Sequence, residues 1–246
     1  MKKEGKIIAI SNLKGGVGKT SIVQNLGAEL FNRGKRILYI DMDSQQNLSL
    51  ILKGSGRYKS IYEVLTTQDT TGAIQSTSQG DLIRGEAAIL TLKEVPGEAL
   101  KKALEKIKTE YDYILIDTPP TYNAIINSSL IAADEILIPC ETDLFSFQGI
   151  DTQKKIIDEV KKKLNKKLKI RGIIVNKYEG RSNHNKQILE TIQKKAEEMG
   201  AKVYTIRKNV AISKAQAFQQ NIFEFDNKSN GAADYKTLVG EILENG

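Results

Sequence analysis

The sequence predicts an α/β fold in which a mainly parallel, twisted sheet carries helices on both faces. Short β-branched runs alternate with helical patterns from one end of the chain to the other, which is typical of strand–helix–strand units with right-handed crossovers. The strands are largely apolar, as strands buried on both faces are. The 246 residues have room for one large domain. We therefore expect a single domain over residues 1–246.

The elements follow in order from hydrophobic spacing. Lys6–Ile10 predicts a buried strand, and the helix expected at 19–32 has Ile22, Leu26 and Leu30 at i, i+4 and i+8 before its stop at Gly34. Further strands are expected at 36–40, 80–84, 113–117, 135–140, 169–175 and 202–206. Helices are expected near 97–108, 123–132, 147–164, 185–199 and 229–244. Residues 53–80 are rich in Gly, Ser, Thr and Gln and predict a surface excursion.

Composition excludes several classes of protein. A hydrophobic fraction of 40% with 27% charged residues is that of a globular chain. No apolar run reaches the roughly 18 residues that cross a bilayer, and no signal-peptide core is present, so we expect a cytoplasmic protein. Cys140 and His184, the single residues of their kinds, cannot make an internal disulfide or a metal cage within one chain. Redox and soft-metal functions are not expected.

The net charge is unevenly distributed. Residues 1–150 hold 17 Lys and Arg against 18 Asp and Glu, and residues 151–246 hold 20 against 12. The balances are therefore −1 and +8. Such asymmetry indicates a polyanion near the C-terminal half, with nucleic acid first and an anionic membrane second. Solubilising helix faces explain the charge equally well at this point.

A phosphate-binding loop follows the first strand and opens the first helix. Its residues are Leu13, Lys14, Gly15, Gly16, Val17, Gly18, Lys19, Thr20 and Ser21. Backbone N–H groups at a helix N-terminus face an anion, and glycines let the backbone come close to it. Lys19 is expected on the β- and γ-phosphates, and the Thr20 hydroxyl on Mg²⁺. The position of the usual first glycine is Leu13, and Lys14 adds a second lysine five residues before Lys19.

This pattern resembles the deviant Walker A motif of the ParA/MinD superfamily of P-loop ATPases. The resemblance implies that ATP and Mg²⁺ bind at residues 14–21, and it extends to Asp41-Met42-Asp43-Ser44-Gln45-Gln46-Asn47. That segment is similar to the family's Asp-x-Asp-Pro-Gln-Gly-Asn, with Ser44 and Gln46 in place of Pro and Gly. Asp43 is implied to position the attacking water at the metal, with Asp41 in support near Mg²⁺.

Two later segments extend the resemblance. Tyr113-Ile114-Leu115-Ile116-Asp117-Thr118-Pro119-Pro120 has the form of a Walker B strand, in which Asp117 holds Mg²⁺ through water. Gly172-Ile173-Ile174-Val175-Asn176 is similar to the family strand whose terminal Asn recognises adenine. Ile206-Arg207-Lys208-Asn209-Val210 has Arg207 where the family has proline, at the far wall of the base pocket.

The second lysine carries an implication for assembly. In the superfamily, the residue that matches Lys14 crosses to the γ-phosphate of a facing subunit, as an arginine finger does. The resemblance therefore implies an ATP-dependent homodimer whose hydrolysis waits on dimerisation. Such a protein is a switch that ATP closes and hydrolysis opens.

The remaining sequence selects a branch of the superfamily. MinD-like proteins carry a basic amphipathic C-terminal helix for membranes, whereas the charged residues of 234–246 are mostly acidic. Stable membrane association is not expected, and Leu238 and Ile242 are expected to pack on the core. The chain thus resembles the ParA/Soj branch of DNA-dependent partition ATPases. Its phosphate loop begins near residue 14, so no preceding helix-turn-helix domain is expected.

The branch implies a function and its surfaces. An ATP-bound dimer binds double-stranded DNA non-specifically on the nucleoid, and a ParB-type centromere-binding protein stimulates hydrolysis. DNA contacts are expected from Arg181, Lys186, Lys208 and Lys214. The lysines at 161–163 and 166–167 are expected to be solvated, on a helix whose Ile156, Ile157, Val160 and Leu164 face inward. A MinD-like membrane-associated switch and a ParA-like ATPase that positions a protein cargo remain open alternatives.

Overall fold

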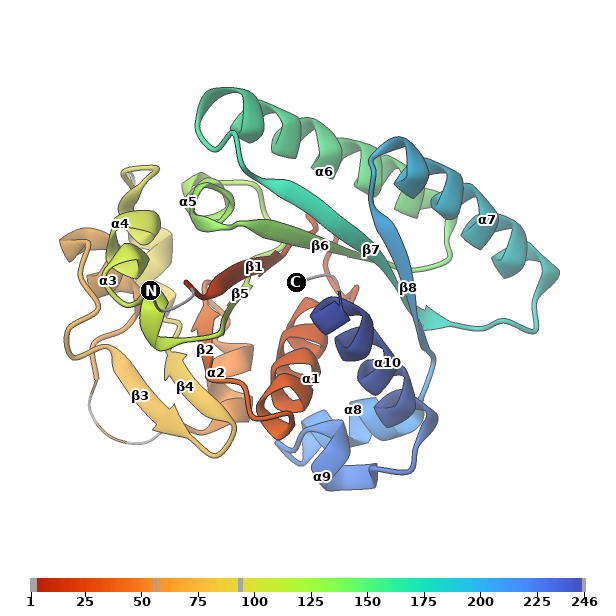
Figure 1. The fold of residues 1–246 in the computed structure, drawn as a ribbon, viewed down its shortest axis with the longest axis horizontal. Helices are drawn as coiled ribbons and strands as arrows, with labels where there is room; N and C mark the ends of the chain where they lie inside the picture. Colours follow the sequence, from red (N-terminus) through yellow and green to blue (C-terminus); the bar gives the residue numbers. More distant parts are fainter. Residues whose placement is uncertain (1–3, 55, 57, 93–94, 245–246) are drawn as a thin grey trace.

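The computed structural model describes residues 4–54, 56, 58–92 and 95–244. In this part of the chain, eight strands form one sheet in the order β3-β4-β2-β5-β1-β6-β7-β8 (Figure 1). Every pair of neighbouring strands is parallel except β3 and β4. The strands are β1 Lys6–Ile10, β2 Ile37–Asp41, β3 Ile74–Thr77, β4 Gly80–Ile83, β5 Tyr113–Asp117, β6 Glu135–Cys140, β7 Lys169–Tyr178 and β8 Lys202–Arg207. The predicted fold class is confirmed.

The helices include those expected and several shorter ones. They are α1 Lys19–Asn32, α2 Asn47–Leu52, α3 Ile61–Thr67, α4 Ala99–Glu105, α5 Ala124–Ala132, α6 Leu144–Lys163, α7 Asn183–Glu198, α8 Val210–Ala217, α9 Ile222–Asp226 and α10 Asn230–Glu244, with 3₁₀ turns η1 Ala87–Thr91 and η2 Lys108–Glu110. The expectation of a surface excursion at residues 53–80 was wrong in part, because Ile61, Val64 and Leu65 of α3 are buried in the core. A capping box at Ser60 and Glu63 begins α3.

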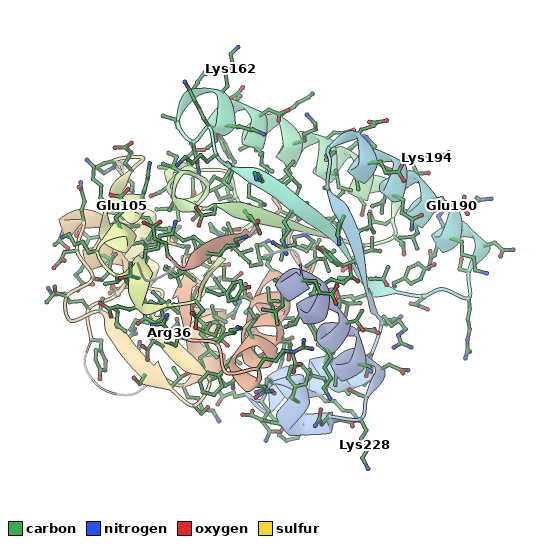
Figure 2. The ribbon with its side chains drawn as sticks, viewed as in Figure 1. Arg36, Glu105, Lys162, Glu190, Lys194 and Lys228 are labelled. Atoms are coloured by element: carbon green, nitrogen blue, oxygen red, sulfur yellow. The ribbon has the colours of Figure 1, made fainter. Side chains whose placement is uncertain are left out.

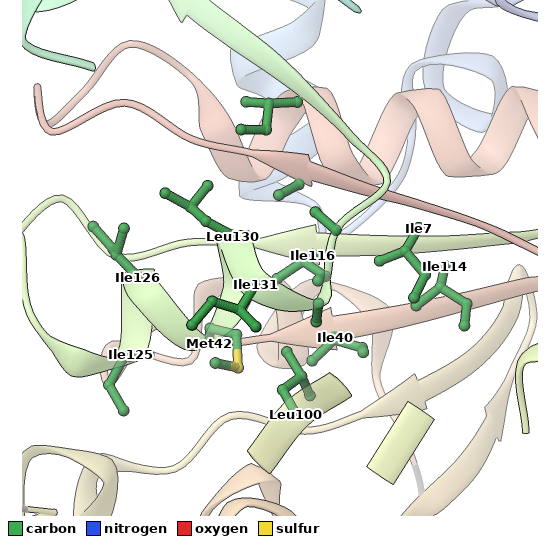
Figure 3. Packing of buried hydrophobic residues seen from close by; sticks show 14 of the residues in the cluster. Ile7, Ile40, Met42, Leu100, Ile114, Ile116, Ile125, Ile126, Leu130 and Ile131 are labelled. Atoms are coloured by element: carbon green, nitrogen blue, oxygen red, sulfur yellow. The ribbon is translucent and has the colours of Figure 1, made fainter. Parts of the chain in front are cut away.

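Alternation along the strands divides the core into two layers. Ile7 and Ala9 of β1 face the layer that contains α3 to α7, while Ile8 and Ile10 face α1, α2, α9 and α10. Figure 1 shows α4 to α7 on one side of the sheet and α1, α8, α9 and α10 on the other. Figure 3 shows part of the first layer, in which Leu100 of α4 belongs to the same buried cluster as Ile40, Met42 and Ile116.

The inward face of α6 was predicted correctly except at its end. Ile157 and Val160 are buried, but Leu164 is 52% exposed. The helix ends at Lys163, and the Asn165 Nδ2 donates to the carbonyls of Leu130, Ile131 and Ala133 at the end of α5. Because Asn165 takes the inward position in this turn, Leu164 points outward.

The C-terminal helix packs as expected. Leu238 and Ile242 of α10 are buried against α1 and the sheet, and residues 245–246 of the acidic tail lie outside the described residues. No described helix is both long enough and apolar enough to span a membrane.

Candidate nucleotide site

The candidate site lies at the carboxyl edge of the sheet, where parallel strands place their end residues together. Asp41 ends β2 opposite Asp117 of β5, and Asp117 is opposite Ile10 of β1. The loop at residues 13–18 connects β1 to α1. A cavity of about 810 Å³ opens here; the residues around it include Gly15, Gly16, Gly18, Lys19, Thr20, Ser21, Asp43, Asn176, Lys177, Arg207 and Lys208. The structure thus gathers predicted residues from five separate segments.

Two loop glycines have backbones that other residues adopt only with strain. Gly16 and Gly18 have φ of 76° and 91°, in the left-handed region. A Cβ on Gly18 would also lie 2.2 Å from Nδ2 of Asn176. The loop therefore needs glycine at position 18 for two independent reasons.

Lys19 lies inside the loop. Its ammonium donates to the carbonyls of Asn12 at 2.9 Å and Lys14 at 3.2 Å, and the residue is 7% exposed. Burial lowers the pKa of Lys19, while Asp117 and Asp43 act in the opposite direction. The cation is thus held inside the loop that would surround a phosphate.

Asp117 and Thr20 form the part of the site that fits Mg²⁺. The Thr20 Oγ1 donates to Oδ2 of Asp117 at 2.6 Å, and the other oxygen of Asp117 is buried with no hydrogen-bond partner among the described residues. Burial raises the pKa of Asp117 well above its usual range, and Asp41 adds to the shift. A buried carboxylate oxygen without a partner, beside a hydroxyl, fits a cation that binds through water.

Asp41 acts through the backbone around it. Its carboxylate accepts from the Ser49 amide at 2.9 Å and hydroxyl at 2.6 Å, and from the Asp43 amide at 3.1 Å. Burial raises the pKa of Asp41 and these hydrogen bonds oppose the shift. Asp41 thus fixes the turn that carries Asp43 to the wall of the cavity.

Gln46 stands where the family motif has glycine, and its backbone has the left-handed conformation that glycine favours. Its φ is 57° and it is the N-cap of α2. A left-handed conformation at a non-glycine residue costs on the order of 1 kcal/mol. The substitution therefore preserves the turn after Asp43 at some cost in stability.

Lys14 does not reach outward in the single chain. Its amide donates to Oδ1 of Asn12 at 3.0 Å, and its ammonium forms an ion pair with Asp143, in the turn between β6 and the body of α6. Both side chains are 34% exposed. The second lysine of the motif is therefore held by a carboxylate of its own chain.

At the end of the cavity where the adenine base is expected, two residues already have partners within the chain. The Asn176 Nδ2 donates to the Val17 carbonyl at 2.9 Å. The Arg207 guanidinium pairs with Asp234 of α10, with a shortest distance of 2.6 Å, and this contact raises the pKa of Arg207. Arg207 therefore forms part of the cavity wall while it fixes the end of β8 to α10.

Comparison with known proteins identifies the family. The family model AAA_31, described as an AAA domain, matches residues 5–170. The chain is 34% identical over 255 residues to the sporulation initiation inhibitor protein Soj of Bacillus subtilis, covering 98% of this chain and 100% of Soj. The chain belongs to the ParA/Soj family. It is also 32% identical over 254 residues to the chromosome partitioning protein ParA of Caulobacter vibrioides, covering 97% of this chain and 94% of that protein.

A similar solved structure contains a bound nucleotide and a metal ion. This ParA/Soj-family chain is similar to cobyrinic acid a,c-diamide synthase of Mycobacterium smegmatis with bound ATP analogue and magnesium, at 25% identity and a TM-score of 0.83, over 98% of this chain and 95% of that one. The protein is therefore an ATPase of the ParA/Soj family that uses ATP and Mg²⁺.

The four basic residues expected on DNA have different surroundings in this ParA/Soj-family protein. Arg181 and Lys186 are exposed where β7 turns into α7, and Lys214 is exposed on α8. Lys208 pairs with Glu179 at 2.6 Å, which raises the pKa of Lys208. Since β7 and β8 are parallel to β1, Arg181 and Lys208 follow strands that end at the nucleotide edge.

The other lysine cluster lies at the opposite edge. Lys161, Lys166 and Lys167 surround a hollow with Lys6 and Lys169, which begin β1 and β7. Figure 2 shows Lys162 at the end of α6 away from the turn into α7. The two basic groups are therefore separated by the length of the strands.

Several residues of the nucleotide site were not predicted from the sequence. Asn12 connects the loop to β6 through its Nδ2, which donates to the Pro139 carbonyl at 2.6 Å. Ser49, Asp143 and Lys177 contact predicted residues from other elements. Lys177 directly follows Asn176, and this position next to a predicted site residue is the sequence feature that could have indicated its role.

Proposed function

We propose that this ATPase is a DNA partition switch, with one domain over residues 1–246 and a cytoplasmic, nucleoid-associated location. ATP closes a homodimer, the dimer binds double-stranded DNA non-specifically, and a ParB-type partner triggers hydrolysis and release. The observation that carries the proposal is the placement of Arg181 and Lys186 after a strand that ends at the nucleotide edge. A dimer closed around ATP would bring two copies of this basic surface together.

Each predicted site residue has a role in this proposal. The loop N–H groups and Lys19 hold the β- and γ-phosphates, and Thr20 and Asp117 hold Mg²⁺. Bound Mg²⁺ neutralises charge on the phosphate oxygens. Asp43 orients the attacking water while Asp41 keeps the Asp43 turn in place. Asn176 and Arg207 line the base end.

The dimer step concerns Lys14. To reach the γ-phosphate of a facing subunit, the Lys14 ammonium must leave Asp143. Its backbone contacts to Asn12 and Lys19 do not depend on the side chain, so the loop remains formed while the ammonium changes partner. The Asp143 contact thus favours the monomer.

Removing that contact should favour the dimer. We expect Asp143→Asn to strengthen ATP-dependent dimerisation by up to about thirtyfold, because each dimer breaks two of these partly exposed ion pairs and each pair contributes up to about 1 kcal/mol. Analytical ultracentrifugation with a non-hydrolysable ATP analogue measures this. Asp158→Asn is the matched control, since Asp158 pairs with Lys154 elsewhere on α6. Weaker dimerisation of Asp143→Asn would contradict a role in the monomer.

The buried apolar side of α10 supports DNA over a membrane as the partner. An amphipathic membrane anchor needs an unpartnered apolar face, but Tyr235, Leu238 and Ile242 are buried in the core. The two acids in the last turns, Glu241 and Glu244, would be repelled by anionic lipid. Neither property suits a membrane anchor.

The experiment that tests the proposal is ATP-dependent binding to non-specific double-stranded DNA. We expect Arg181→Ala with Lys186→Ala to weaken binding at least about tenfold near 100 mM salt and to lower the salt slope by about 4, because each subunit of the dimer loses two phosphate contacts and each lost contact lowers the slope by about 1. Fluorescence anisotropy across a salt series measures both quantities.

The matched control removes the same charge at the opposite edge. Lys162→Ala with Lys163→Ala should leave DNA affinity within about threefold, because these lysines lie far from the nucleotide edge. Equal binding with and without ATP, or a larger loss in this control than in the first variant, would contradict the proposal.

A further inference from the structure

The end of β7 departs from regular strand geometry beside the phosphate loop. Val175 pairs with Thr205 of β8, and the next pair joins Tyr178 to Arg207. Strand β7 therefore advances three residues while β8 advances two, which is a β-bulge containing Asn176 and Lys177. Lys177 has φ of 53°, a left-handed backbone that is strained at any residue with a Cβ. Bulges of this kind redirect side chains.

The redirected side chains both reach the loop. The Lys177 ammonium donates to the Gly16 carbonyl at 2.9 Å and pairs with Glu141 at 2.7 Å. Asn176 donates to the next carbonyl, that of Val17, at 2.9 Å. Two consecutive peptide units of the loop are therefore held through their carbonyl oxygens by two consecutive residues of β7.

The geometry of a peptide unit gives these contacts a consequence. A trans peptide is planar, so its C=O and N–H point in opposite directions, and no cis peptide occurs among the described residues. The Gly16 carbonyl belongs to the same peptide unit as the Val17 N–H, and the Val17 carbonyl to that of the Gly18 N–H. Holding the carbonyls toward β7 therefore turns both N–H groups away from it, as donors for an anion.

We propose that Lys177 is a positioning residue of the phosphate site, which fixes the Gly16–Val17 peptide so that its N–H faces the polyphosphate of the nucleotide. Its effect is on binding of the phosphates common to ATP and ADP. The chemical step does not depend on it directly. This proposal rests on the ATPase activity alone and is independent of DNA binding.

The environment of Lys177 supports a functional role for the contact. Its side chain is 50% exposed, so its ammonium could remain hydrated without contacting the loop. The left-handed backbone and the bulge lower the stability of the fold, and a lysine whose only role was to be solvated would need neither. A positive charge also lies beside a cavity that receives a polyanion.

The test removes the ammonium group of Lys177 and keeps an unbranched apolar side chain of similar length. We expect Lys177→Met to weaken binding of Mg·ADP and of a non-hydrolysable Mg·ATP analogue equally, by about tenfold, because hydrogen bonds from charged donors contribute at about that level. KM for ATP should rise to a similar extent, with kcat within about threefold. Isothermal titration calorimetry and steady-state kinetics measure these quantities, and Lys177→Arg should recover most of the affinity.

Two further variants separate positioning from folding and from charge. Lys177→Gly removes the ammonium and relieves the left-handed backbone, so it should melt no lower than the wild type while it loses affinity as Lys177→Met does. Lys154→Met removes one charge from the exposed side of α6 and should leave affinity within twofold. Affinity of Lys177→Met within twofold of the wild type would overturn the proposal. So would a loss confined to ATP, or an equal loss in Lys154→Met.

Discussion

Mixing two inactive variants, Lys14→Ala and Asp43→Asn, restores ATP hydrolysis to about a quarter of the wild-type rate if each site of a C2 dimer takes Lys14 from the facing subunit. Random exchange makes half of the dimers mixed. In a mixed dimer, the Lys14→Ala subunit supplies Asp43 and receives Lys14 from its partner, so one of two sites is complete. If Lys14 acted within its own chain, no mixed dimer would have a complete site.

Each variant alone should lose most of its activity. A cation supplied across an interface to a transferring phosphoryl group contributes about 10³-fold or more, so we expect kcat of Lys14→Ala to fall at least about 100-fold. ATP affinity of the monomer should change little, because the backbone amide and carbonyl of Lys14 keep their contacts to Asn12 and Lys19. Asn at position 43 can still accept from the Gln45 amide, so the turn is preserved.

The measurement is phosphate release as a function of mixing ratio. A maximum at equal amounts of the two variants is the expected result. The control mixes Lys14→Ala with a double variant that carries both changes, which provides no complete site. Activity that remains absent at all ratios, although the mixed dimers form, would contradict transfer of Lys14 between subunits.

Asp117→Asn should have two effects of opposite sign. Hydrolysis should fall at least about 100-fold, because the carboxylate that would hold Mg²⁺ is lost. The nucleotide-free protein should nevertheless become more stable, by about 1–2 kcal/mol near pH 8. Asp117 is fully buried, its Oδ1 has no hydrogen-bond partner in the described part of the chain, and Asp41 lies opposite to it.

The pH dependence follows from the direction of the pKa shift. Burial and Asp41 raise the pKa of Asp117 in the folded state, whereas an unfolded Asp titrates near about 3.9. Between these two values the folded state binds more protons, so the stability of the wild type falls as pH rises through that window. The variant lacks this titration, and its advantage in unfolding free energy should therefore be small near pH 4 and grow toward neutral pH.

Denaturant unfolding at a series of pH values, with and without Mg·ADP, measures this effect. The bound nucleotide and metal should stabilise the wild type more than the variant. Asp112→Asn is a useful control, because Arg36 lowers the pKa of Asp112. Loss of the Asp112 carboxylate should destabilise the protein by an amount that stays constant above about pH 5, so this variant should not show a difference that grows toward neutral pH. A variant less stable than the wild type at pH 8 would contradict a destabilising effect of the buried Asp117 carboxylate.

The sequence was most informative where chemistry requires particular neighbours along the chain. A phosphate loop needs glycines and a lysine at fixed spacing between a strand and a helix, so Gly16, Gly18 and Lys19 could be identified from residues 14–21 alone. Asp117 ends one predicted strand and Asp41 directly follows another, and parallel strands end at one edge, so the proximity of the two residues was also predictable. Short elements such as β3 and α9 were missed because four or five residues carry too little periodicity.

What the sequence by itself determined was the fold class, the family and the residues that meet the nucleotide edge. The tertiary structure alone decided the partners of the charged side chains. Lys14 pairs with Asp143, 129 positions away, and Lys177 contacts Gly16, 161 positions away. Local spacing fixes which residues share a loop or a strand end. A contact between distant segments depends on strand order, on a bulge in β7 and on the turn after β6, and none of these has a local signature.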